Sequence, residues 1–217
     1  MADTWNNPDK FNREASQWDE NPRRRALALA VAKAIIDAVK PAKTMRALEF
    51  GCGTGLVTFE IAPLVERLSA IDTSCEMLTV LQEKISTSQV KNIEVSSIDL
   101  SSSSEADEHD QSFELIYSSM TLHHIADTAG FLNRIANLLS PGGIIAIADL
   151  DLEDGLFHDD PFEKVHHGFD REKLSDQLKA AGLQVQSFET IYRFEKINRS
   201  GITAVYPVFL VTATRVH

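Results

Sequence analysis

Three glycines at alternate positions, directly after an apolar run, constrain the fold of this chain more than any other feature. The stretch is ALEFGCGTGLVTFEIA, residues 47–62, in which Gly51, Gly53 and Gly55 follow Glu49 and precede a helical pattern. Glycine has no Cβ atom, so the backbone can adopt positive φ and approach a ligand closely. Loops between a strand and a helix are about two to six residues long and rarely need three glycines. The stretch therefore predicts a strand, a bare turn that contacts a ligand, and a helix.

Strand-like and helix-like runs alternate along the middle of the chain, which is typical of βα units that build a parallel sheet. The strand-like runs are short and rich in Ile, Leu, Val and Phe, as expected for strands covered by helices on both faces. SPGG, residues 140–143, predicts the end of a helix and a turn into the fifth strand. The expected strands are near 45–50, 68–72, 93–98, 113–118 and 143–149, and the expected helices near 56–66, 74–86, 128–139 and 170–181.

Both ends of the chain add elements to this sheet. Asn-Pro pairs at 7–8 and 21–22 each place a capping side chain before a proline that suits the first helical turn, so two helices are expected there. Near the carboxyl end, the strand-like runs 183–195 and 204–214 flank a polar stretch with a glycine and predict an antiparallel hairpin. A length of 217 residues fits one domain, which would contain seven strands.

The glycine spacing limits the kind of ligand. A dinucleotide fold needs G-x-G-x-x-G, but Leu56 stands where the third glycine belongs, and no Gly-Lys-Ser/Thr follows to make a phosphate loop. Glu49 would repel a pyrophosphate but attract an ammonium group. These features indicate a nucleotide-like ligand without phosphate at the switch point of the sheet.

With these features in order, the chain resembles the class I S-adenosylmethionine-dependent methyltransferases. Glu49-x-Gly-x-Gly-x-Gly resembles their first motif, and Asp72, Asp99 in SSIDLS, LHH and LSPGG follow in the family's order. The resemblance covers about residues 9–150 and extends loosely to the methyltransferases of ubiquinone and menaquinone biosynthesis. It implies S-adenosyl-L-methionine as cofactor and an α/β, Rossmann-like fold, whose seven-stranded sheet is mostly parallel with strand 7 antiparallel and has helices on both faces.

The resemblance also implies roles for particular residues. In the family, the acidic residue at the position of Asp72 binds the ribose, the one at Asp99 binds the adenine amino group, and the residue at Leu100 contacts the ring. Aromatic residues of the N-terminal helix lie near the cofactor, as expected here for Phe11 and Trp18. The expected cofactor-binding residues are Trp18, Glu49, Gly51, Cys52, Gly53, Gly55, Asp72, Thr73, Met77, Asp99, Leu100 and Ser118.

Methyl transfer from a sulfonium needs in-line placement and exclusion of water more than covalent help from the protein. A hydroxyl or protonated amine acceptor also needs a base, and histidine is the usual base near neutral pH. His123 and His124 follow the fourth strand, and because adjacent side chains diverge we expect at most one of them in the pocket. The candidate catalytic residues are His123 and His166, with a structural role as the alternative. No compact ligand spacing accompanies the histidines, so no metal is expected.

The single domain, 1–217, divides into a helical cap at 1–41, a cofactor-binding core at 44–150 and an acceptor-side segment with a C-terminal hairpin at 151–217. Within the last part, the loop 151–169 is expected to be an acceptor lid or, equally, a surface loop with packed aromatic residues. The residues expected as hinges and apolar cover are Gly155, Gly168, Phe157, Phe162 and Phe169.

The charge balance limits the partners. A formal net charge of −11 argues against nucleic acid, and the one basic run, 23–25, is expected to be a solvated helix start. Acidic residues concentrate in 101–112 and 149–163, both expected to be loops. The chain lacks a long apolar run, an apolar signal core and the cysteine spacing of a disulfide framework or zinc site. We therefore expect a cytoplasmic protein with reduced thiols and no membrane partner.

The function expected is transfer of a methyl group from S-adenosylmethionine to a small-molecule acceptor by direct displacement. Three other functions stay open: a protein or nucleic-acid methyltransferase, a non-catalytic module that binds the cofactor, and a nicotinamide oxidoreductase. The fourth strand lacks the Asn/Asp-Pro-Pro-Tyr/Phe motif of nucleic-acid enzymes that methylate amino groups. The sequence does not specify the atom that accepts the methyl group or the oligomeric state.

Overall fold

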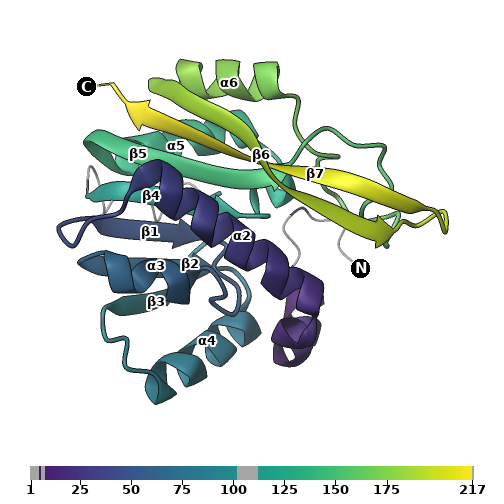
Figure 1. The fold of residues 1–217 in the computed structure, drawn as a ribbon, viewed down its shortest axis with the longest axis horizontal. Coiled ribbons are helices and arrows are strands. Elements are labelled where there is room, and N and C mark those ends of the chain that lie inside the picture. The colour runs from purple at the N-terminus through teal and green to yellow at the C-terminus, as the bar shows by residue number, and fades with distance from the viewer. Residues whose placement is uncertain (1–4, 6–7, 102–111, 217) are drawn as a thin grey trace.

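One seven-stranded sheet forms the centre of the protein in the computed structural model, which describes residue 5 and residues 8–101 and 112–216. The strand order is β3-β2-β1-β4-β5-β7-β6 (Figure 1). Neighbouring strands are parallel except that β7 runs antiparallel to both β5 and β6, which confirms the predicted sheet. The strands are β1 Arg46–Phe50, β2 Arg67–Asp72, β3 Ile93–Ser97, β4 Phe113–Ser119, β5 Leu139–Leu150, β6 Leu183–Ile197 and β7 Thr203–Arg215.

Helices cover both faces of the sheet (Figure 1). α2, α3 and α4 pack on one face, and α5 and α6 on the other. In the described part of the chain, none of the helices combines the length and the apolar character that crossing a bilayer requires. The helices are α1 Pro8–Glu14, η1 Ala15–Glu20, α2 Pro22–Val39, α3 Thr58–Ile61, η2 Ala62–Leu64, α4 Cys75–Thr87, η4 Leu122–His124, α5 Thr128–Leu138 and α6 Arg171–Ala180.

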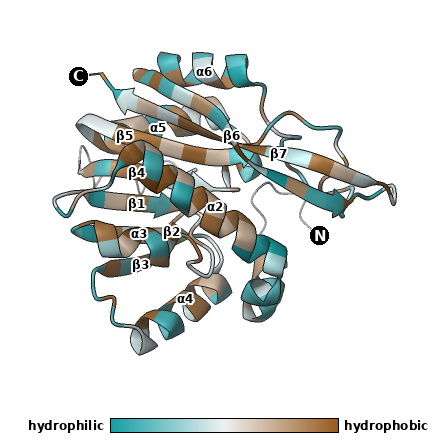
Figure 2. Ribbon diagram, viewed as in Figure 1, coloured by the Kyte–Doolittle hydropathy of each residue, from teal (hydrophilic) through white to brown (hydrophobic). Residues whose placement is uncertain are grey.

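The core lies in two apolar layers, one on each face of the sheet. Successive strand residues point to opposite faces, so Ile145 and Ile147 of β5 join one layer while Ala146 and Ala148 join the other. β5 is hydrophobic over most of its length, whereas the helices carry both hydrophobic and hydrophilic residues (Figure 2). β4 and β5 are buried along most of their length. This explains why their sequences are apolar and do not alternate between apolar and polar residues.

The start of α2 agrees with its sequence pattern. Asn21 Oδ1 accepts hydrogen bonds from the backbone N–H groups of Arg23 and Arg24, and Pro22 occupies the first turn. The helix ends at Val39, and the next residue, Lys40, adopts a left-handed conformation (φ 54°). The prediction for residues 21–22 is confirmed; the Asn at position 7 lies outside the described residues, as does most of the acidic segment 101–112.

Two predicted elements differ from the structure in length. β5 begins at Leu139 and includes SPGG, which was expected to be a turn, and the register with β4 shifts between Phe113 and Leu115 to accommodate the extra residues. The helix expected over 56–66 is only the four-residue α3, which continues as the 3-10 turn η2. Pro63 lacks an N–H group and cannot continue an α-helix there.

The strand order places a crevice at one edge of the sheet. β1 pairs with both β2 and β4, so the connection after β1 leaves toward β2 whereas β4 lies on the other side. Such a switch point leaves room outside the carboxyl ends of the strands, and ligands of open α/β sheets bind there.

Candidate active site

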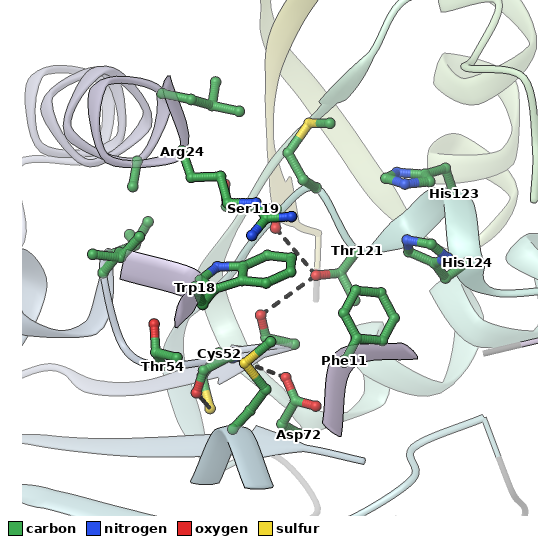
Figure 3. A pocket seen from close by; sticks show the side chains of 18 of the residues that line it. Phe11, Trp18, Arg24, Cys52, Thr54, Asp72, Ser119, Thr121, His123 and His124 are labelled. Carbon is green, nitrogen blue, oxygen red and sulfur yellow. Dashed lines mark hydrogen bonds between the residues drawn. The ribbon is translucent and has the colours of Figure 1, made fainter. Parts of the chain in front are cut away.

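A cavity of about 530 Å³ opens at the carboxyl ends of β1, β2 and β4, at the switch point of the sheet. The N-terminal segment, the loop after β5 and the end of β6 complete its walls. Figure 3 shows the cavity with Phe11 and Trp18 from the N-terminal segment, Asp72 from β2, and His123 and His124 from η4. A volume of this size is within the range of about 300–1,000 Å³ found for small-molecule sites.

The glycine turn after β1 forms one wall. Gly51 (φ 67°) and Gly53 (φ 52°) both adopt left-handed conformations that suit glycine. A Cβ atom on Gly51 would overlap the side chain of Thr121, so the turn packs tightly against the segment that follows β4. A Cβ on Gly53 would meet no atom within 4 Å, and this open space is part of the cavity. Gly55 (φ 86°) packs against Leu81 instead and does not line the cavity.

Asp72, the last residue of β2, connects the glycine turn to the start of α4. Its Oδ2 accepts the backbone N–H of Gly53 and its Oδ1 that of Ser74, each at 2.8 Å. Burial raises the pKa of Asp72, and the hydrogen bonds from Ser74 and Gly53 oppose that shift. The carboxylate is therefore held in one place at the cavity wall.

Glu49 contributes a buried carboxyl group beneath the turn. Its Oε2 accepts hydrogen bonds from Thr58 Oγ1 at 2.5 Å and from the Tyr117 hydroxyl at 3.0 Å. Burial raises the pKa of Glu49 to about 8, against the opposing effect of these two hydrogen bonds, and the charge of Asp72 raises it further. A positive group placed in the cavity would favour the ionised form of Glu49.

Aromatic residues of the N-terminal segment cover the cavity. The rings of Phe11 and Trp18 have centroids 5.8 Å apart, and both line it. The Arg24 guanidinium lies 3.6 Å from the Trp18 ring centroid, a cation–π contact that fixes the indole. Asp19 Oδ1 accepts a hydrogen bond from Thr54 Oγ1 at 2.5 Å and so joins the segment to the glycine turn.

Met120 follows β4 in a conformation that is unusual for a side-chain-bearing residue. Its φ is 56°, and its backbone N–H donates to the Ala148 carbonyl oxygen at 2.8 Å. Met120 lines the cavity between the glycine turn and the histidines. Left-handed conformations of non-glycine residues cost about 1–3 kcal/mol and concentrate at functional sites.

His123 and Asp149 form a buried pair on the opposite wall. His123 Nδ1 lies 2.7 Å from Asp149 Oδ1, and the His123 backbone N–H donates to Oδ2 of the same carboxylate at 3.1 Å. Both side chains are at most 3% exposed. Since a carboxylate can only accept, the proton of a neutral His123 ring resides on Nδ1 and the lone pair on Nε2.

His123 and His124 both line the cavity, so the prediction that at most one would do so was wrong. The two residues belong to the 3-10 turn η4 rather than to an extended segment, and their ring centroids are 4.1 Å apart (Figure 3). Side chains diverge by about 180° in a strand, but not in a turn. The His124 ring also contacts Phe11, at a centroid distance of 5.2 Å.

A third histidine, His158, joins this wall from the loop after β5. Its ring centroid is 5.1 Å from that of His123 and 5.8 Å from that of His124. Burial lowers the pKa of His158 to about 3, and that of His124 falls well below its ordinary value for the same reason. Sequence patterns give no reason to group His158 with these residues, because 34 positions of chain separate it from His124.

The rest of the loop 151–169 differs from the cover that was expected. Phe157 lines the cavity, whereas Phe162 is 87% exposed and Phe169 is buried in the core on the α6 side. His166 does not line the cavity; its Nε2 bonds the Ile125 carbonyl oxygen at 2.9 Å. Its backbone N–H donates to the carbonyl oxygen of His123 at 2.8 Å, and this bond joins the loop after β5 to η4.

Most of the expected cofactor-binding residues lie together on the cavity: Trp18, Glu49, Gly51, Cys52, Gly53, Asp72, Thr73, Met77 and Leu100. Three others do not line it: Gly55, Asp99 and Ser118. Asp99 accepts hydrogen bonds from the backbone N–H and the hydroxyl of Ser101. Ser118 is fully buried in β4, and its Oγ has no hydrogen-bond partner in the described part of the chain. Ser119 takes the cavity position in place of Ser118, because adjacent strand residues face opposite ways.

Comparison with known proteins agrees with this arrangement. A family model described as a methyltransferase domain matches residues 41–194. An uncharacterized methyltransferase of Schizosaccharomyces pombe is 30% identical over 151 residues, 64% of this chain and 53% of that protein. An O-methyltransferase of Aspergillus nomiae is 27% identical over 197 residues, 86% of this chain and 84% of that protein. A methyltransferase structure from Aquifex aeolicus, described as SAM dependent, superimposes with a TM-score of 0.70 at 20% identity, covering 97% of this chain and 99% of the other.

The chain spans 53% of the Schizosaccharomyces pombe relative and 62% of a mycobacterial one, so the similarity to these proteins concerns part of their length. The family model nevertheless covers most of this chain, including the glycine turn, Asp72 and the three histidines of the cavity. The chain therefore belongs to the class I S-adenosylmethionine-dependent methyltransferases, the family that its sequence resembles.

Proposed function

We propose that the protein transfers a methyl group from S-adenosylmethionine to a hydroxyl group of a small molecule, with His123 as the acceptor of the hydroxyl proton. The observation that carries the proposal is that one cavity is lined by the glycine turn and Asp72 and also by His123. Relatives named O-methyltransferases, in Aspergillus nomiae and Methylocella silvestris, favour oxygen as the methylated atom.

The residues at the glycine turn fit S-adenosylmethionine. Each oxygen of Asp72 accepts a backbone N–H, and a carboxylate oxygen has about two acceptor sites, so the group retains capacity for ribose hydroxyls. The open space beside Gly53 lets a ligand contact the backbone, and Glu49 offers a carboxyl group to an ammonium. When bound, the cofactor supplies a methyl group on a sulfonium whose leaving group is a neutral thioether.

Part of the remaining wall suits the apolar body of an acceptor. Leu27 and Ala28 of α2, Phe157 of the loop after β5 and Phe194 of β6 line the cavity with hydrocarbon and aromatic surface. Such walls bind the apolar body of a ligand and exclude water, while a few polar groups fix its orientation. A phenol or another hydroxylated ring compound has this combination of an apolar body and one reactive oxygen.

The His123–Asp149 pair supports removal of the proton. Asp149 holds the Nδ1–H, so the Nε2 lone pair of His123 is available to the acceptor hydroxyl. In the transfer, the acceptor oxygen forms a C–O bond, the methyl–sulfur bond breaks with its electron pair on sulfur, and the hydroxyl proton moves to Nε2. His166, whose ring lies outside the cavity, acts here as a positioning residue through its bond to the His123 carbonyl.

The test combines binding with turnover on the full chain. We expect calorimetry to show S-adenosylmethionine binding, and incubation with labelled cofactor and a set of phenols and catechols to release S-adenosylhomocysteine and a methyl ether. Binding without turnover, when thiols and amines are also supplied, would overturn the catalytic proposal in favour of a non-catalytic binding module. Turnover only with thiols or amines would overturn oxygen as the acceptor atom.

A further inference from the structure

The imidazole rings of His123, His124 and His158 meet on one wall of the cavity, which we call the acceptor wall. One ring nitrogen from each of His123, His124 and His158 lies within 4.8 Å of the other two. Within the described ranges, no other group of three His, Cys, Asp or Glu side chains comes together in this way. Two of the rings come from η4 and the third from the loop after β5, so the fold assembles a group that the sequence separates.

One ring nitrogen of this cluster, His158 Nδ1, is buried and has no hydrogen-bond partner among the residues that the structure describes. The ring contacts of His124 are with Phe11, His123 and His158, all through ring faces or edges. A buried nitrogen without a partner is unfavourable unless a ligand satisfies it.

His123 has the arrangement expected of a metal ligand. Asp149 accepts its Nδ1–H at 2.7 Å, and a carboxylate on the far nitrogen is the usual support for a histidine that coordinates through the other one. The Asp149 side chain also accepts the backbone N–H groups of His123 and Leu150, so the carboxylate is itself fixed.

We propose that His123, His124 and His158 bind a divalent transition metal ion of the zinc class, with an open coordination position that faces the acceptor cavity. Three histidine ligands with an open position are typical of catalytic rather than structural zinc. A set made only of imidazoles favours zinc, copper, nickel or iron and disfavours magnesium and calcium, which prefer oxygen ligands. At zinc–nitrogen distances of about 2.1 Å, tetrahedral ligand atoms are roughly 3.4 Å apart, so the three nitrogens, which lie within 4.8 Å of one another, would move closer together when the metal binds.

The surrounding charges are compatible with a dication. The two lysines that approach the cluster are each paired with a carboxylate: Lys10 Nζ with Glu163 at 2.8 Å, and Lys196 Nζ with Asp159 at 2.9 Å. The negative charge of Asp149 is buried directly behind His123. The pairs remove much of the repulsion that the lysines would otherwise exert on the metal.

The metal site rests on the proposed function, which supplies the acceptor hydroxyl. It changes one step of that function, the removal of the hydroxyl proton. With metal bound, Nε2 of His123 is a ligand, and the acceptor hydroxyl coordinates the metal and releases its proton to water before its oxygen takes the methyl group. Coordination lowers the pKa of a bound oxygen acid, so no separate base is needed. Without metal, His123 accepts the proton directly.

The test uses the full chain, stripped with a chelator and then titrated with zinc chloride in a calorimeter. We expect one zinc ion per chain, and affinity at least about tenfold weaker in His158→Gln, which lacks one ligand. His167→Gln is the matched control, because His167 is an exposed histidine of the same loop outside the cluster, and it should bind zinc as the wild type does. A wild type that binds no zinc, or equal affinity in wild type and His158→Gln, would overturn the inference.

A second measurement remains valid if His158→Gln does not fold. Cobalt(II) added to the stripped wild type should give the intense visible bands of a four- or five-coordinate ion, whereas the weak bands of octahedral cobalt would overturn the inference. S-adenosylmethionine binding is measured on the same stripped protein. If that binding and methyl transfer persist while zinc does not bind, only the metal inference fails; if zinc binds but the cofactor does not, the proposed function fails.

Discussion

The backbone N–H of Gly53 donates to Oδ2 of Asp72 over 2.8 Å, and this bond joins the turn after β1 to the last residue of β2. Both residues line the cavity, and the space beside Gly53 is open. The bond therefore holds a carboxylate beside bare backbone at the switch point of the sheet. Changes at either residue should act on cofactor binding more than on the core.

Gly53→Ala should abolish S-adenosylmethionine binding at cofactor concentrations that saturate the wild type. The new methyl group would occupy cavity space, and alanine disfavours the left-handed backbone at this position. Gly142→Ala is the matched control, because Gly142 also has positive φ and open space around it but lies at the start of β5. Both variants should lose roughly 1–2 kcal/mol of stability from backbone strain, measured by urea denaturation. Equal cofactor affinity in the two variants would contradict the proposal that the cofactor binds beside Gly53.

Glu49 should make the ligand-free protein less stable as the pH rises. The unfolded chain releases this proton near the ordinary pKa of 4.5, whereas the folded chain keeps it until about pH 8. The folded state therefore binds more protons between these values, and the free energy of unfolding falls as the pH increases through that window. The side chain in Glu49→Gln cannot titrate. Between pH 5.5 and 7.5 the free energy of unfolding of this variant should therefore fall by less than that of the wild type, and the difference between the two decreases should be on the order of 2 kcal/mol. Parallel pH curves from urea denaturation would contradict the buried, protonated state of Glu49.

His123→Gln should lower kcat by about 100-fold or more, as loss of a general base or of a metal ligand does, while the Kd of S-adenosylmethionine changes little. Asp149→Asn should also lower kcat, by at least about tenfold, because an amide can stabilise the wrong tautomer of His123. The rates are measured with the acceptor that gives turnover.

The exposed His167, changed to Gln, is the control for removing a histidine from this region. Its kcat should match that of the wild type. If the His123→Gln and His167→Gln rates were the same, the acceptor wall would not contribute to chemistry.

Local sequence patterns predicted the cavity residues at the glycine turn and at Asp72, because these residues lie at strand ends or directly after them. Glu49 lies near the end of β1, Gly51 follows that strand and Asp72 ends β2, so all three lie at the same edge of the sheet. The sheet topology followed from the same alternation. The strand and helix ends were less accessible, as in β5, where a shift in register and not a turn accommodates SPGG.

The acceptor half depended on tertiary packing that periodicity does not encode. In the sequence, Asp149 is an acidic residue near the end of an apolar strand, with no sign of a partner. In the structure its carboxylate is buried against His123. His158 reaches the same wall from a loop without regular structure, and His166, which looks equivalent in sequence, bonds a backbone carbonyl instead. Which histidine of a loop enters a cavity is decided by the path of that loop.

The most direct test of the cofactor site is calorimetric titration of S-adenosylmethionine into the wild type, Asp72→Asn and Asp170→Asn. Asp170 caps α6 through the Lys173 N–H and lies outside the cavity, so it controls for loss of a carboxylate that accepts a backbone hydrogen bond. We predict binding to the wild type and Asp170→Asn with equal affinity, and binding about tenfold or more weaker in Asp72→Asn, because the amide is a poorer acceptor for hydroxyl groups. Equal affinity in all three proteins, or no binding to the wild type, would contradict the account.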